Sequence, residues 1–138
     1  MEIMEVKPSQ RKGRFLVKLE DGNILRVTEE EVLRFSLAAG MELDDESLEA
    51  LDESAQRSAV RAAAASMIGS RPLSKKELTR RLVRKGADEE DAGEAADWLE
   101  DIGAVNDREY AAMLVRHYAG KGYGRARIRE EMYRRGVD

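Results

Sequence analysis

The sequence of 138 residues contains no cysteine, two prolines and a single histidine. The absence of cysteine excludes disulfide bonds and thiolate metal sites. No apolar run approaches the ~20 residues that a membrane-spanning helix needs. The first residues also lack the basic and then apolar pattern of a secretory signal. We therefore expect a cytoplasmic protein.

The residues that usually carry catalysis are equally scarce. His117 has no second histidine or cysteine with which to form a zinc site or a catalytic triad. The glycine-rich stretch 120–124 follows a predicted helix rather than a strand, so it indicates a helix end and not a phosphate loop. One predicted helix carries an acidic stripe, namely Glu90, Glu94, Asp97 and Asp101. Carboxylates on a single helix rarely converge on an ion, so a protein contact or a solvated face is favoured. We expect no enzyme activity, no cofactor and no metal site.

Residues 1–52 are predicted to form a small β-meander, one helix and an acidic connection. Alternating apolar residues predict strands over 3–6, 14–19 and 24–27. Asp21-Gly22 between the last two strands is typical of a tight turn. Thr28 and Glu31 form a capping box, which predicts a helix that ends at Gly40.

Residues 53–104 are predicted to form a three-helix bundle. The acidic connection, part of it helical from Asp44, leads into a first helix that starts at about Ser54. Ser74 caps the second helix and Asp88 caps the third. The third helix has an apolar stripe at helical spacing, made of Ala92, Ala95, Trp98, Leu99 and Ile102.

The sequence repeats itself at an offset of 50 residues. Arg84-Lys85-Gly86-Ala87-Asp88 is similar to Arg134-Arg135-Gly136-Val137-Asp138, and apolar residues align at the same offset. Residues 105–138 are therefore predicted to form a second repeat, truncated before a third helix that would begin at Asp138. That truncation is expected to leave Ile128 and Met132 uncovered, unless the first repeat covers them. The predicted fold class is mainly α, with tandem three-helix-bundle repeats in an elongated array preceded by a small β-meander plus helix.

Charged residues are segregated along the chain, although the net charge is only −4. Lys76, Arg80 and Arg84 lie four residues apart on one helix, with no acid at that spacing. Like charges so placed repel one another, so they face either an anionic partner or solvent alone. The predicted partner-binding surface comprises Arg71, Lys75, Lys76, Arg80, Arg84, Arg116, Lys121, Arg125 and Arg127.

An ordered set of residues resembles the RecX family, bacterial regulators of the RecA recombinase. The set consists of Arg71-Pro72-Leu73-Ser74-Lys75-Lys76-Glu77-Leu78, Leu82, Lys85-Gly86, Trp98-Leu99, Gly103, Asn106-Asp107, Tyr110-Ala111 and Gly136-Val137. The resemblance spans nearly the whole chain. The family typically has three such units, and this chain departs from that pattern by ending inside the second.

The resemblance implies a regulator of homologous recombination, DNA repair and the SOS response. Its implied partner is RecA in a filament with single-stranded DNA, whose ATP hydrolysis and strand exchange the family inhibits. Direct contact with DNA is also possible on this view. The resemblance leaves open whether the filament is inhibited or disassembled. Two other functions remain open from the residues alone: a sequence-independent DNA-binding module, and a helical protein–protein adaptor unrelated to RecA.

Overall fold

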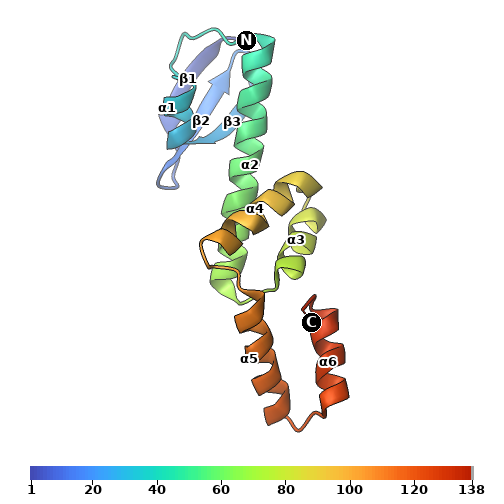
Figure 1. The fold of residues 1–138 in the computed structure, drawn as a ribbon. Helices are drawn as coiled ribbons and strands as arrows, with labels where there is room; N and C mark the ends of the chain where they lie inside the picture. The colour runs from blue at the N-terminus through green and yellow to red at the C-terminus, as the bar shows by residue number, and fades with distance from the viewer. Residues whose placement is uncertain (138) are drawn as a thin grey trace. The chain divides into compact units, whose positions relative to one another are not determined.

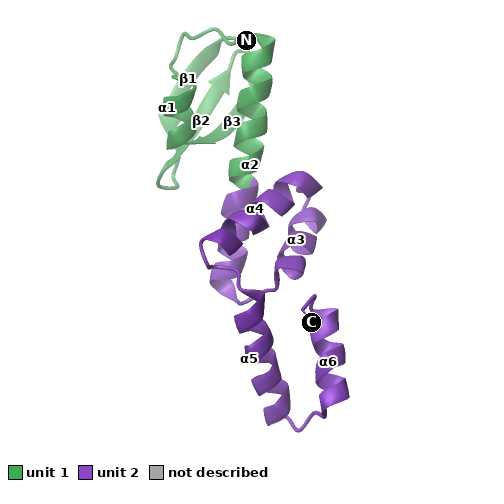
Figure 2. Cartoon of the chain, in the orientation of Figure 1, with its two compact units in different colours: residues 1–59 green, residues 60–138 purple. Residues whose placement is uncertain are grey.

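The structure, a computed structural model, describes residues 1–137. Along the chain a three-stranded sheet precedes a series of helices (Figure 1). The elements are β1 (Ile3–Pro8), β2 (Arg14–Leu19), β3 (Ile24–Thr28), α1 (Glu29–Arg34), α2 (Asp45–Ser70), α3 (Lys75–Arg84), α4 (Glu89–Asp101), α5 (Asp107–Gly120) and α6 (Arg125–Arg134). The chain divides into two compact units, residues 1–59 and 60–138 (Figure 2).

The sheet of the first unit is an antiparallel meander in the order β1-β2-β3. Its strand and turn assignments confirm the sequence prediction, including the turn at Gly22, whose φ of 89° suits glycine. Alternate residues point to one face, where Ile3, Val17 and Val27 are almost fully buried. Leu43, in the segment between α1 and α2, and Leu51 of α2 complete this core.

Helix α1 is shorter than the sequence predicts. Thr28 and Glu31 form the expected capping box, but the helix ends at Arg34 and not near Gly40. Ser36 adopts a positive φ of 53°, which turns the chain out of the helix. Leu37 is then buried against the sheet. Burial of this one leucine therefore favours an early helix end over continued helix.

Helix α2 is longer than the sequence predicts. It begins at Asp45, which confirms the predicted helical start at Asp44, and runs without interruption for 26 residues. The expected separate helix starting near Ser54 is therefore wrong. Asp44 caps the helix through the N–H of Ser47, and acids occupy the first turn as the helix dipole favours. Leu51, which lies inside the supposed connection, is fully buried on the sheet. The predicted segment boundary at residue 53 thus falls inside α2.

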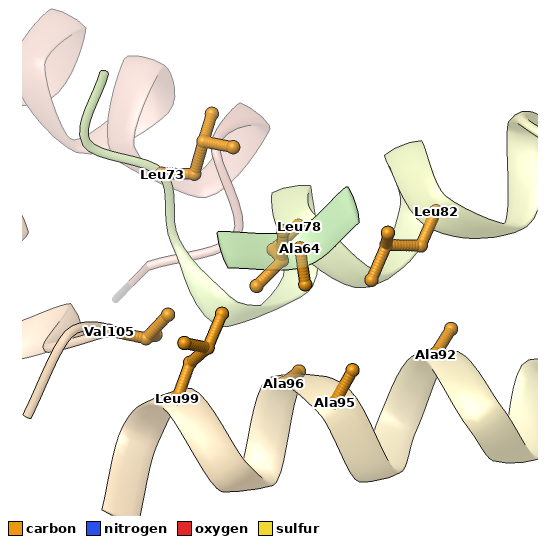
Figure 3. Close-up of a cluster of buried hydrophobic side chains, with 9 residues drawn as sticks. All are labelled: Ala64, Leu73, Leu78, Leu82, Ala92, Ala95, Ala96, Leu99 and Val105. Carbon is orange, nitrogen blue, oxygen red and sulfur yellow. The ribbon is translucent and has the colours of Figure 1, made fainter. Parts of the chain in front are cut away.

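The first helical repeat consists of the second half of α2 together with α3 and α4. Leu78 and Leu82 on α3 meet Leu99 and the alanines of α4, and Ala64 of α2 completes the contact (Figure 3). The small alanine side chains let the helices approach closely. The apolar stripe predicts that Ile102 joins this core, but its side chain is 61 % exposed. Helix α4 has already ended there, and Val105 is buried in the same core after the turn.

The second repeat copies the first at the predicted offset. Helices α3 and α6 are both ten residues long and begin at residues 75 and 125. Each ends in the same hydrogen-bonded turn, with a glycine of positive φ at Gly86 and Gly136. Helices α5 and α6 enclose a smaller core of Tyr110, Leu114, Tyr118, Met132 and Val137. Met132 is buried in this core and Ile128 packs against it, whereas the predicted third helix at Asp138 lies outside the described residues.

Candidate partner-binding surface

The basic surface of α3 follows from the way that helix is anchored. Ser74 accepts a hydrogen bond from the N–H of Glu77, and the Glu77 carboxylate accepts one from the N–H of Ser74. Leu78 and Leu82 are buried on the opposite face. The remaining side holds three exposed cations, Lys76, Arg80 and Arg84, which we call the α3 ridge. None of the three has an ion-pair or hydrogen-bond partner for its side chain among residues 1–137.

Lys75 is not part of this free surface. Its ammonium lies 2.6 Å from Asp97 and 3.0 Å from Glu100, both on α4. Hydrogen bonds to these two carboxylates raise the pKa of Lys75 well above its ordinary value. The backbone N–H of Lys75 also donates to Asp107, at the start of α5. Lys75 therefore joins three helices of the second unit.

The acidic stripe of α4 is partly used for contacts within the same unit. Arg61 of α2 donates from its Nε to Glu94 at 2.9 Å and lies over the Trp98 ring. Asp97 pairs with Lys75. Glu90 and Asp101 remain exposed. No cluster of residues able to hold a metal ion occurs within the part of the chain that the structure describes.

A second group of cations surrounds the turn between α5 and α6. Lys121 caps the end of α5, and Arg125 and Arg127 lie in the first turn of α6; we call these three residues the α5–α6 turn patch. The Arg127 guanidinium lies 3.7 Å from the centre of the Tyr123 ring. Tyr123 in turn stacks on Tyr118, with ring centres 5.1 Å apart. Arg127 is thus held in place by a cation–π contact while remaining exposed.

Sequence reasoning missed Arg135, which organises the second repeat. Its guanidinium donates to the hydroxyl oxygens of Tyr110 at 3.2 Å and Tyr118 at 3.0 Å. Its backbone carbonyl accepts a hydrogen bond from the Ser74 hydroxyl. Burial is the main cause that raises the pKa of Tyr110. The offset of 50 pairs Arg135 with the exposed Lys85, so the repeat alone indicated a surface cation.

The nine predicted residues do not form one patch. The α3 ridge starts beside the end of α6, since Lys76 lies next to Gly136. The α5–α6 turn patch lies at the far end of α5, a helix of 14 residues that spans about 20 Å. Arg71 and Arg116 are exposed singly, before α3 and on α5. A partner that contacts all the free cations must therefore be extended.

The fold is that of a helical-repeat protein in which a small sheet precedes the helices. Residues 106–138 match the family model for the second three-helix domain of RecX. The chain is 39 % identical over 80 residues to the regulatory protein RecX of Pseudomonas entomophila (strain L48). It is 43 % identical over 68 residues to the regulatory protein RecX of Xanthomonas axonopodis pv. citri (strain 306). These matches confirm that the chain resembles the RecX family.

These similarities cover parts of the proteins concerned. The Pseudomonas match spans 58 % of this chain and 52 % of the relative, and the Xanthomonas match spans 49 % and 42 %. The chain thus spans about half the length of the curated relatives it matches. A crystal structure of a regulatory protein RecX superposes with a TM-score of 0.68, over 96 % of this chain and 73 % of the other. At 21 % identity that likeness shows the fold.

Within residues 1–137, no helix combines the length and the apolar character needed to cross a bilayer.

Proposed function

We propose that the chain binds the filament of RecA on single-stranded DNA and inhibits its ATPase and recombinase activity. The observation that carries this proposal is the α3 ridge, three exposed cations on one helix face that have no side-chain partner among residues 1–137. Mutual repulsion along such a face costs a few tenths of a kcal/mol per pair. An anionic partner would relieve that repulsion, and a nucleoprotein filament supplies phosphates and acidic side chains together.

The proposed contact surface is the α3 ridge, the α5–α6 turn patch, Arg71 and Arg116. Lys75 is left out because its charge is already neutralised by two carboxylates of α4. It acts instead by fixing α3 against α4, so that the ridge presents its cations in one orientation. The spread of the remaining cations along α3, α5 and α6 suits a long partner better than a compact one.

The test is the single-stranded-DNA-dependent ATPase of RecA from the same source, titrated with the chain. The variant Lys76→Glu, Arg80→Glu, Arg84→Glu is expected to need at least a tenfold higher concentration for half inhibition. Reversal of charges that contact phosphate should also make filament binding less dependent on salt.

A matched control reverses three other exposed bases, Arg57, Arg108 and Arg129, with the same change in net charge. It should inhibit like the unaltered chain. Equal loss in both variants would attribute the effect to net charge and remove the ridge from the proposal. If the unaltered chain neither inhibits nor binds the filament, regulation of RecA by this chain is refuted.

A further inference from the structure

The outer face of the N-terminal sheet is a second basic surface, and it belongs to the first compact unit. Opposed residues of neighbouring strands share a face, and Lys7, Leu16 and Arg26 are direct partners across β1, β2 and β3. Arg14 and Lys18 lie on the same face, two residues to either side of Leu16. The register thus surrounds one leucine with four cations.

The opposite face of the same sheet is the buried one. Ile3, Val17 and Val27 on that face pack against Leu43 and against Leu51 of α2. On the outer face Lys7, Lys18 and Arg26 are exposed. Strand spacing puts the backbones of Lys7 and Arg26 about 10 Å apart, with Leu16 between them.

Contacts within the described part of the first unit leave most of these cations without an acidic partner. The only acid of the three strands on this face is Glu5, which lies 4.0 Å from the Lys7 ammonium. Arg14, Lys18 and Arg26 have no side-chain partner among the described residues. Exposed Arg11 and Lys12, in the turn between β1 and β2, extend the positive charge beyond the strands. Uncompensated like charges on one sheet face oppose folding slightly, so a polyanion would stabilise it.

We propose that this sheet face binds the phosphate backbone of single-stranded nucleic acid without reading its sequence. Phosphate contacts require cations and no stacking platform. The face carries no aromatic side chain, because Phe15 points to the core side with Val27. The apolar side chains of this face are the partly buried Leu16 and the 53 % exposed Ile24, which pairs with Lys18. Four cations surround Leu16, so charge outweighs apolar surface, unlike the aromatic and apolar centre usual in a protein interface.

The shape of the surface favours a single strand over a duplex. Sheets are twisted, and duplex DNA is stiff over about 150 base pairs. A straight duplex therefore touches a small twisted face at few phosphates, while a flexible strand can follow it. This contact goes beyond the proposed function: it lies in the other compact unit, and its ligand requires no RecA.

The test measures binding of the full chain to a fluorescently labelled oligothymidine and to a duplex of equal length, in the absence of RecA. The variant Lys7→Gln, Lys18→Gln, Arg26→Gln is expected to weaken oligothymidine binding at least tenfold. Loss of three phosphate contacts should lower the slope of log affinity against log salt by about 2. Circular dichroism checks that the sheet and helices of the variant are intact.

The matched control, Ala39→Glu, Ala50→Glu, Ala59→Glu, changes net charge equally at exposed positions outside the strands. It should bind within about twofold of the unaltered chain. The proposal is overturned if the unaltered chain does not bind oligothymidine at low salt. It is also overturned if the glutamine variant binds as well as the unaltered chain, or if the duplex binds more tightly. Loss of binding to a RecA filament alone would assign the face to a protein contact instead. Inhibition of RecA is a separate assay, so each proposal can fail while the other stands.

Discussion

The repeat supplies a matched pair of glycines that tests how the end of α6 is packed. Gly86 and Gly136 occupy equivalent positions after α3 and α6, with φ of 105° and 78°. A Cβ added at Gly86 would meet nothing within 4 Å. A Cβ added at Gly136 would lie 2.7 Å from the Cβ of Lys76 and 3.2 Å from the Ser74 hydroxyl oxygen. The same substitution therefore meets two different environments.

The expected losses follow from two contributions. Placing alanine in the left-handed region costs about 1–2 kcal/mol at either site. At Gly136 the new methyl group also collides with a Cβ atom, which cannot move away without moving α3. Displacing the end of α6 would break the hydrogen bond from Ser74 to the Arg135 carbonyl, worth about 0.5–1.5 kcal/mol. We expect Gly86→Ala to lower the free energy of unfolding by about 1–2 kcal/mol and Gly136→Ala by about 1.5–3.5 kcal/mol.

Urea unfolding followed by far-ultraviolet circular dichroism measures both losses, provided that the slope with urea is unchanged. Lys76→Gly removes the colliding Cβ, so in that background Gly136→Ala should cost no more than Gly86→Ala. Equal losses for the two alanine variants in the unaltered background would refute the reasoning, since the contact of α6 with the start of α3 would then carry no energy.

Two further predictions concern buried polar groups. The raised pKa of Tyr110 means that the folded state holds the phenol proton more tightly than the unfolded state does. The resulting stability is present below about pH 10 and is lost as the pH rises above it. Tyr110→Phe should therefore reduce the fall in the free energy of unfolding at alkaline pH. Curves of unfolding free energy against pH that run parallel for the variant and the unaltered chain would contradict this. Glu31, 2 % exposed, accepts hydrogen bonds from the Thr28 N–H at 2.9 Å, the Ser58 hydroxyl at 3.0 Å and the Ser54 hydroxyl. Glu31→Ala should lower the free energy of unfolding, measured with urea, by about 2–4 kcal/mol. The exposed control Glu30→Ala should change it by no more than about 0.5 kcal/mol. A loss at Glu31 no larger than that at Glu30 would contradict a stabilising role for these hydrogen bonds.

Local sequence signals predicted the elements whose ends are decided locally. The capping boxes at Thr28 and Ser74 begin α1 and α3, and both occur in the structure. The offset of 50 predicted equivalent turns at Gly86 and Gly136, and both turns have the same hydrogen bonds. Caps and turns are reliable because their hydrogen bonds join residues close together in the sequence.

The sequence predictions were wrong where contacts between residues far apart in the sequence set a helix end or a buried position. Burial of Leu37 on the sheet ends α1 early, and burial of Leu51 on the same sheet brings the acidic stretch into α2. Exposure of Ile102 reflects the turn that places Val105 in the core instead. Each of these helix ends and buried positions depends on which surface the residue packs against, and a local sequence pattern does not predict that surface.

For the basic surfaces, too, the sequence predicted one part and the tertiary structure decided the rest. The spacing of Lys76, Arg80 and Arg84 by itself determined that one face of a helix is positively charged. Only the tertiary structure separated Lys75 from that face, and only strand register gathered Lys7, Lys18 and Arg26 on one side of the sheet. A sequence determines which charges exist and which share a helix face, because helical spacing is fixed. Which charges are neutralised and which meet across strands depends on residues brought together from far along the chain.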